Sequence, residues 1–134
     1  MKIEDVEGIG PTFAEKLAAA GVGTTEKLLD RGASDAGRSA LAAETGISQQ
    51  LILKWVNHAD LMRIDGVGSE YADLLEAAGV DSCAELARRN AANLAITFQE
   101  LDAARPNTVR RVPSEETVRG WIAQADHLAK VVTH

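Results

Sequence analysis

Apolar residues recur along this chain at the three- and four-residue spacing that is typical of amphipathic α-helices. The pattern is clearest in two stretches that each carry one tryptophan: Leu51, Ile52, Trp55, Ala59 and Met62 in one, and Val118, Trp121, Ile122, Ala125 and Leu128 in the other. No segment is convincing as a β-strand. The pattern therefore predicts an all-α fold.

Capping residues and glycines divide the chain into expected helices. Pro11 suits the first turn of a helix, and Gly21 suits its end. Ser82 and Glu85 have the spacing of a capping box. On these signals we expect helices over residues 11–21, 25–30, 34–46, 48–64, 69–78, 82–88, 93–104 and 114–131.

The sequence also repeats itself. Val6–Gly10 (VEGIG) recurs as Ile64–Gly68 (IDGVG), 58 residues later. Further matches follow in the same order, first at that offset and later at an offset of 66: Phe13 with Tyr71, Leu17 with Leu75, Ala19–Val22 with Ala77–Val80, Leu28 with Leu86, Ser48 with Ser114, and Trp55 with Trp121. The larger offset places about eight extra residues within 97–112. We interpret the chain as a duplicated unit, with repeats at 1–60 and 61–134 that form one compact pseudo-twofold domain.

The composition fits a small helical protein. The chain has 134 residues, 46% hydrophobic and 25% charged, which suits one ordinary domain or two very small ones. No segment approaches the roughly 18 apolar residues of a membrane span, and Met1–Asp5 lacks the apolar core of a signal peptide. The single cysteine, Cys83, cannot form an internal disulfide. We therefore expect a cytoplasmic protein that does not bind membranes.

The charge is distributed unevenly. The net charge of −6 excludes an indiscriminate polycation that coats DNA. It divides into −3 over residues 1–60, −5 over 61–87 and +2 over 88–134. The inserted loop, residues 105–111, contributes Arg105, Arg110 and Arg111 and is the best electrostatic site for a phosphate or an acidic protein surface. The alternative is a solvated loop whose arginines pair with neighbouring carboxylates.

Two glycines separated by one apolar residue allow a sharp turn with positive φ and close backbone approach. We call residues 6–10 and 64–68 the first and second glycine turns. A helix is expected directly after each turn, so the amide N–H groups of the turn and of the helix start would form an anion site that suits phosphate. The alternative is that both turns are only tight corners between helices.

The glycine turns resemble the hairpins of helix-hairpin-helix proteins. Over nearly its whole length the chain also resembles a bacterial and archaeal family, the domain of unknown function numbered 4332, which residues 109–114 (VRRVPS) and 131–133 suit as well. The resemblance implies tandem motifs in a compact all-α domain, with turns that hold the sugar-phosphate backbone of DNA without reading its sequence. The residues expected to contact that backbone are Gly8, Ile9, Gly10, Thr12, Lys16, Arg63, Gly66, Val67, Gly68 and Ser69 at the turns, and Arg105, Arg110 and Arg111 in the loop.

The charges beside the turns oppose this function. Carboxylates flank both turns: Glu4, Asp5 and Glu7 at the first, and Asp65, Glu70 and Asp73 at the second. A carboxylate beside a phosphate costs on the order of a kcal/mol at the protein surface. Two function classes therefore stay open. One is a binding module for DNA or another nucleic acid, and the other is a protein-interaction or oligomerisation module in which the acidic middle of one molecule meets the basic last third of another.

Catalysis has little support in the sequence. The histidines 58, 127 and 134 form no metal-ligand pair at helical spacing. Cys83 opens a short helix at the counterpart of Thr25, so we expect a buried thiol and no nucleophile. Trp55 and Trp121 lie on apolar stripes, and we expect them in the core and not stacked on bases. The sequence predicts no enzyme, no cofactor and no metal.

The first glycine turn has no long helix before it, because Met1–Asp5 is too short to pack well alone. The last helix, expected over 114–131, has no turn after it. We therefore predict that the last helix packs beside the first glycine turn and closes the domain. Closure within one chain gives a monomer, and closure between chains gives a swapped dimer.

Overall fold

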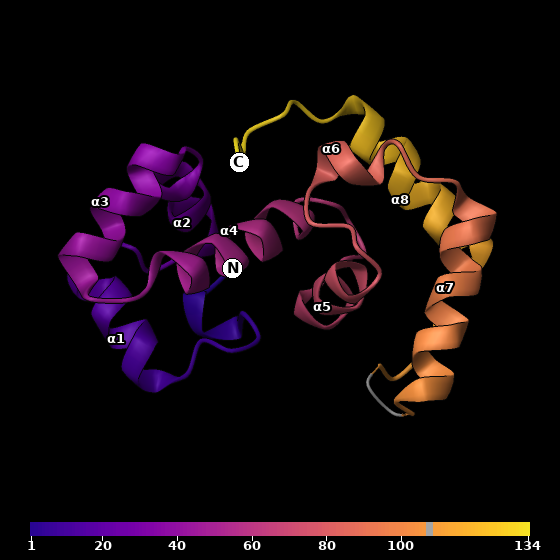
Figure 1. Cartoon of the computed structure of the whole chain (residues 1–134), viewed down its shortest axis with the longest axis horizontal. Coiled ribbons are helices and arrows are strands. Elements are labelled where there is room, and N and C mark those ends of the chain that lie inside the picture. The colour runs from indigo at the N-terminus through magenta and orange to yellow at the C-terminus, as the bar shows by residue number, and fades with distance from the viewer. Residues whose placement is uncertain (107–108) are drawn as a thin grey trace. The chain divides into compact units, whose positions relative to one another are not determined.

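The computed structural model describes residues 1–106 and 109–134. These residues form eight α-helices and one short 3-10 helix without any strand, which confirms the all-α prediction (Figure 1). The elements are η1 (Ile3–Asp5), α1 (Pro11–Ala19), α2 (Thr25–Gly32), α3 (Asp35–Thr45), α4 (Gln49–Leu61), α5 (Ser69–Ala77), α6 (Cys83–Leu86), α7 (Ala91–Ala104) and α8 (Glu115–His127). None of the described helices is long and apolar enough to cross a membrane.

Side-chain caps set the start of six helices. In each, the side-chain oxygen of the capping residue accepts a hydrogen bond of 3.0 to 3.2 Å from the backbone N–H three residues further on. The capping residues are Thr24, Ser34, Ser48, Ser82, Asn90 and Ser114. Gly46 ends α3 in the left-handed conformation that the sequence suggests for it, at φ +74°.

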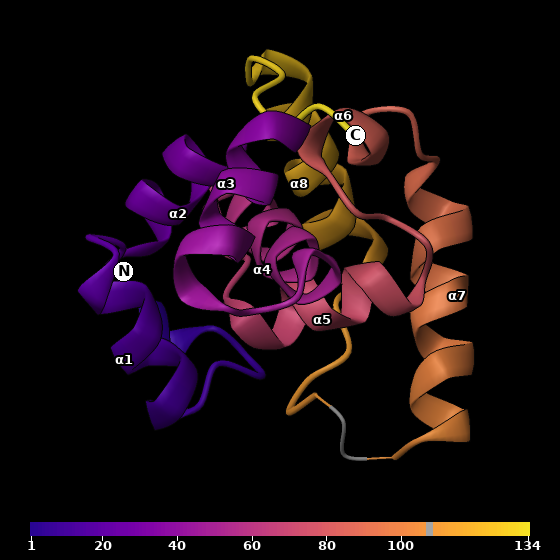
Figure 2. The ribbon, with the colours of Figure 1, turned by 60° about the vertical axis from the view of Figure 1, so that its left-hand side comes forward.

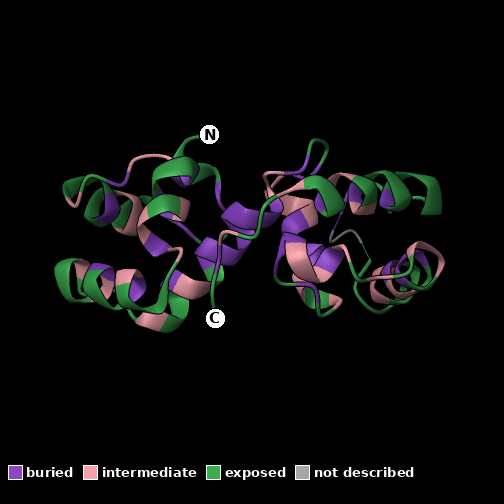
Figure 3. Cartoon of the chain, turned by 90° about the horizontal axis from the view of Figure 1, so that it is seen from above, coloured by how far each residue is buried: buried purple, intermediate pink, exposed green. Residues whose placement is uncertain are grey.

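The chain divides into two compact units. The first unit contains residues 1–60 and 130–134, and the second contains residues 61–129. The helices of each unit carry buried residues along one side and exposed residues along the other (Figure 3). Each unit therefore has a core of its own.

The core of the first unit lies between η1 and helices α1 to α4, which are shown from two directions in Figures 1 and 2. Its largest fully buried apolar side chains are Ile3, Leu17, Leu28, Leu41, Ile52 and Trp55. The ring of Trp55 packs on that of Phe13 at 5.1 Å between centroids and an interplanar angle of 60°. This tilted arrangement is favoured for aromatic pairs.

The core of the second unit lies between α5, α6, α7 and α8, and α8 packs on both α6 and α7. Its buried members include Leu74, Leu75, Leu86, Leu94, Phe98, Val118 and Trp121. The ring of Trp121 packs on that of Tyr71 at 5.3 Å and 52°. These two residues are the repeat counterparts of Trp55 and Phe13.

The last helix is shorter than expected. Helix α8 ends at His127 and not at residue 131, and it belongs to the second unit. The first glycine turn is covered by α4 of its own unit, whose Trp55 lies under Gly8. In the second unit, Trp121 of α8 lies near Gly66 in the same way.

The start of the chain is held within the first unit. Ile3 is buried in η1, its N–H donates to the carbonyl of Gly23 at 3.2 Å, and the N–H of Thr25 donates to the carbonyl of Met1 at 3.0 Å. These bonds anchor the segment before the first glycine turn. Of the residues after α8, only 130–134 join the first unit.

Candidate functional site

Each glycine turn is a pair of consecutive tight bends closed by backbone hydrogen bonds. In the first turn, the N–H of Val6 donates to the carbonyl of Ile3 at 3.2 Å, and the N–H of Ile9 donates to the carbonyl of Val6 at 3.1 Å. In the second turn the corresponding bonds, from Ile64 to Leu61 and from Val67 to Ile64, measure 3.2 and 3.0 Å. The apolar residue between the glycines is buried in both turns, so the two segments share their local geometry.

The two glycines of each turn have different roles. Gly8 and Gly66 have φ angles of +87° and +95°, which disfavour any side chain. Gly10 and Gly68 have φ angles of −80° and −92°, which any residue can adopt. A Cβ added at Gly10 or Gly68 would have no neighbouring atom within 4 Å. Only the first glycine of each turn is therefore required by the backbone conformation.

Helices α1 and α5 start directly after these open glycines. Gly10 and Gly68 are the N-cap residues of the two helices, and no side chain caps either helix. The first N–H groups of a helix have no partner within the helix and form the positive end of its dipole. Among the described helices, these two starts thus differ from the six that a side chain caps.

Carboxylates surround the first glycine turn. An open hollow of about 480 Å³ over this turn is lined by residues 4–10 alone. Glu4, Asp5 and Glu7 are all exposed there. Thr12 and Lys16, also expected to bind, are exposed on α1. The surface of the first turn is therefore acidic, and Lys16, the basic residue expected to bind there, does not line the hollow.

We call the inserted loop, residues 105–111, the arginine loop. The structure brings its residues Arg110 and Arg111 to the start of α5. The backbone N–H of Arg110 donates to the Glu70 carboxylate, and the hydroxyl of Tyr71 donates to the carbonyl of Arg111 at 2.8 Å. Ser69, Glu70 and Tyr71 are the first residues of α5. The backbones of Arg110 and Arg111 therefore lie beside the helix start that follows the second glycine turn, and both arginines are exposed.

Sequence reasoning treated this loop and this turn as separate sites. It counted Glu70 only as a carboxylate that opposes phosphate, whereas in the structure Glu70 holds the loop in place. One feature of the sequence could have indicated the contact: Tyr71 has a hydroxyl where the first repeat has Phe13, and a hydroxyl can donate a hydrogen bond to the loop. Residues 107 and 108 of the arginine loop lie outside the described residues.

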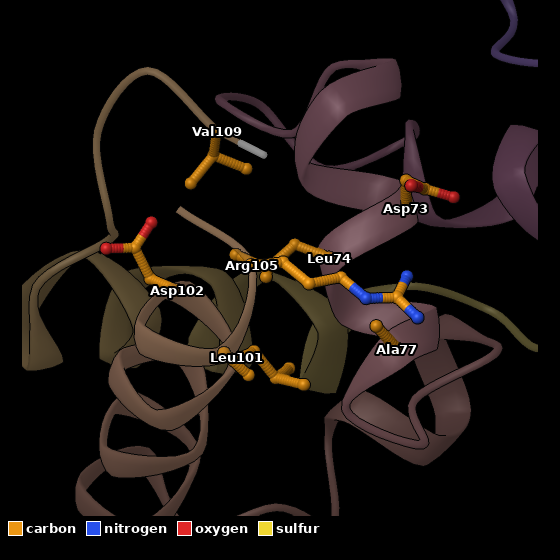
Figure 4. Close-up of a pocket in the computed structure, with 8 residues that line it drawn as sticks. Asp73, Leu74, Ala77, Leu101, Asp102, Arg105 and Val109 are labelled. Carbon is orange, nitrogen blue, oxygen red and sulfur yellow. The ribbon is translucent and has the colours of Figure 1, made fainter. Parts of the chain in front are cut away.

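Arg105 lines a cavity of the second unit (Figure 4). The cavity has a volume of about 270 Å³ and is lined by Asp73, Leu74, Ala77, Leu101, Asp102, Ala104, Arg105 and Val109. In Figure 4 the Arg105 side chain reaches from the end of α7 across to α5. Asp73 and Asp102 line the same cavity, so the surroundings of Arg105 are acidic.

Arg63 connects two parts of the second unit. Its guanidinium donates to the carbonyl of Ala129 at 3.0 Å, just beyond the end of α8. The neighbouring Asp65 exchanges two backbone hydrogen bonds with the side chain of Gln124, at 2.9 and 3.2 Å. Arg63 therefore has a structural role in addition to any contact with a ligand.

The tryptophans and the cysteine are buried. Trp55 and Trp121 are 1% and 3% exposed, which confirms that they pack in the core and do not form a base-stacking surface. Cys83 is buried at the start of α6, as expected.

Comparison with known protein families finds a match that covers most of the chain. The model of the family described as "Domain of unknown function (DUF4332)" matches residues 7–128. No curated protein and no solved structure matches the chain. Because the family model covers nearly the whole sequence, the chain belongs to the DUF4332 family.

Proposed function

We propose that this protein is a non-catalytic module that binds the sugar-phosphate backbone of DNA, or of another nucleic acid, without reading its sequence. The observation that carries the proposal is the open space at Gly10 and Gly68. The fold does not require glycine at either position, yet both repeats have one there. A missing side chain on the outside of a turn lets a ligand approach the backbone N–H groups closely.

The uncapped helix starts support the same function. A phosphate at the N-terminus of α1 or α5 would gain the favourable interaction with the helix dipole, which is worth about 0.3–1 kcal/mol at an exposed site. The helix-hairpin-helix resemblance assigns the same place to the phosphate. One such contact is weak, so useful affinity needs several of them, together with basic side chains.

The second glycine turn is the stronger of the two candidate sites. The backbones of Arg110 and Arg111 lie beside the start of α5, and the Glu70 carboxylate accepts a hydrogen bond from the loop. At the first turn, Glu4, Asp5 and Glu7 repel a phosphate. We expect weak binding that falls steeply as the salt concentration rises, since the contacts are to phosphates. The cytoplasmic location expected from the sequence is compatible with this role.

The proposal is tested by titrating labelled duplex and single-stranded DNA with the protein at low salt. Light scattering measures the mass of the protein in parallel. The informative variants are Gly68→Ser and Gly10→Ser. The side-chain oxygen of a serine at the N-cap accepts a hydrogen bond from a backbone N–H of the first helical turn, so the variant preserves or slightly raises stability while the serine competes with a phosphate. Gly68→Ser should weaken binding more than Gly10→Ser.

The matched control is Gly120→Ser on α8. Gly120 is exposed and, like Gly68, has no atom within 4 Å of an added Cβ, but it lies far from the turns in sequence. This variant should bind as the unchanged protein does. If Gly68→Ser and Gly120→Ser weakened DNA binding equally, the second glycine turn would not be a DNA-binding site.

The second candidate function is a protein-interaction or oligomerisation module. The acidic hollow over the first glycine turn favours it, because its three exposed carboxylates suit a basic protein surface. Absence of DNA binding at low salt, together with a mass that rises with protein concentration, would support this function in place of nucleic-acid binding.

A further inference from the structure

Residues 130–134 form an extended segment that packs into the first unit, and we call this segment the tail. Its Val132 is 2% exposed. The backbone N–H of Thr133 donates to the carbonyl of Ala33 at 2.8 Å, and the carbonyl of Thr133 accepts from the guanidinium of Arg38 at 2.7 Å. The tail is therefore recognised chiefly through its backbone and one apolar side chain.

Three helices of the first unit build the acceptor site for the tail. Arg38 from α3 is 2% exposed and also donates to the carbonyls of Gly32 and Ala33 at the end of α2, at 2.9 and 3.1 Å. Asn57 from α4 forms a hydrogen bond with His134, and the distance between Asn57 Oδ1 and His134 Nε2 is 2.9 Å. These groups converge on the tail from different elements, so the acceptor site is fixed by the packing of the unit.

Close packing holds the end of α2 in place. A Cβ at Gly32 would lie 2.4 Å from Cγ2 of Val56 on α4, so only glycine allows this approach. The carbonyls of Gly32 and Ala33 are thereby presented to Arg38. The acceptor site is thus rigid at the two carbonyls that orient the guanidinium.

The acceptor site needs an occupant. Without the tail, the buried guanidinium of Arg38 would lose its shortest hydrogen bond, and leaving a buried charged donor short of a partner is costly. The site is specific to the first unit. Helix α7 is the counterpart of α3 in the second repeat. Arg38 is the fourth residue of α3, whereas the fourth residue of α7 is the buried Leu94.

We propose that this acceptor site is also a docking site for residues 130–134 of a second copy of the chain, so that two copies associate by exchanging tails. Helix α8 ends at His127, and the tail follows it after two connecting residues. A tail from another copy has the same backbone groups and the same valine, so the exchanged state keeps each of these contacts. The inference does not depend on nucleic-acid binding.

Protein concentration controls the exchange. A tail in its own chain competes at an effective concentration that is on the order of millimolar for a short flexible connection. Exchange therefore increases as the protein approaches that concentration. Exchange is slow, because a departing tail leaves the buried guanidinium of Arg38 without its hydrogen bond to Thr133.

Light scattering of the full chain over a range of concentrations up to roughly millimolar is the decisive experiment. The mass should rise from that of one chain towards that of two. Thr133→Pro removes the N–H that donates to Ala33, and Arg38→Leu removes the guanidinium, so each variant should stay a monomer. A mass of one chain at every concentration overturns the proposal, and so does a dimer that forms equally well in both variants.

Cross-linking shows which surfaces meet in the dimer. A chain with Ala33→Cys is mixed with a chain with Thr133→Cys and then oxidised, and we expect a disulfide-linked pair of the two different chains. The buried Cys83 stays in place. The double variant Ala33→Cys/Thr133→Cys calibrates the geometry by forming the bond within one chain at low concentration.

Ser39→Cys is the matched control because it places an exposed cysteine on the same helix as Arg38. It reports the frequency of random collisions with Thr133→Cys. A mixed Ala33/Thr133 pair that forms several-fold faster than the Ser39/Thr133 pair supports exchange. Equal rates for the two pairs, in protein that dimerises, show that the dimer uses another surface and overturn the proposal.

Discussion

The indole nitrogen of Trp121 lies 3.2 Å from the position that a Cβ on Gly66 would occupy. Trp55 has the same relationship to Gly8 at 3.6 Å. Trp55 comes from α4 and Trp121 from α8, and each packs on the aromatic residue that follows the turn of its own unit. The tryptophans thus support the turns from inside, while the second glycine of each turn leaves the outside open.

Gly66→Ala should lower the free energy of unfolding by about 1–3 kcal/mol. The reasons are the positive φ angle of this residue and the close indole of Trp121. Denaturant unfolding measures the change. Gly120→Ala is the control. It should stabilise the protein by about 0.5–1 kcal/mol, because alanine is the better residue inside a helix. Equal shifts in both variants would contradict the assigned role of Gly66.

Phe98→Ala should be the most damaging of these changes, at about 3–5 kcal/mol. Phe98 is fully buried in the core of the second unit. Ile96 lies on the same helix but is 53% exposed, so Ile96→Ala should cost less than about 0.5 kcal/mol. Thermal and denaturant unfolding compare the two variants. A similar cost for both would show that α7 does not pack as described.

Tyr71→Phe should cost about 0.5–1 kcal/mol and loosen the loop after residue 108. The change removes the hydroxyl that donates to the carbonyl of Arg111 at 2.8 Å. Phenylalanine fits this place in the fold, because its counterpart Phe13 already packs on Trp55. Amide hydrogen exchange at Arg110 and Arg111 should speed up, while exchange in the core of the first unit stays unchanged. Unchanged exchange in the loop would show that Glu70 alone holds it.

Arg38→Leu should release the tail while the first unit stays folded. Leu94 shows that leucine suits the corresponding position of a helix in this chain. The free energy of unfolding should fall by about 1–3 kcal/mol, because carbonyls near the tail lose a charged donor. Exchange of the Thr133 amide, followed by NMR, should become much faster than in the unchanged protein. Full protection of that amide in the variant would mean that Arg38 is not what holds the tail.

The caps and the glycine turns were predictable from the sequence because each depends on residues that are close together in the chain. A serine oxygen caps an N–H three residues away, and the two glycines of a turn are separated by one residue. The expected helix starts at Ser34, Ser48, Ser82 and Ser114 are confirmed for that reason. The predicted end of the last helix, at residue 131, was wrong, since α8 ends at His127. The apolar spacing continues to Val131 and Val132, but Val132 packs into the first unit and does not continue the helix.

Only the tertiary structure decided which distant segments meet. The arginine loop is held by residues about 40 positions earlier, and the tail by an arginine 95 positions earlier. These contacts depend on where packed helices place a carbonyl or a carboxylate, and no local periodicity encodes that position. The sequence by itself determined an all-α chain with a repeated glycine turn. The tertiary structure decided that Arg110 and Arg111 are bonded to the start of α5. It also decided that the tail lies in the first unit, because there the buried guanidinium of Arg38 finds a carbonyl to donate to.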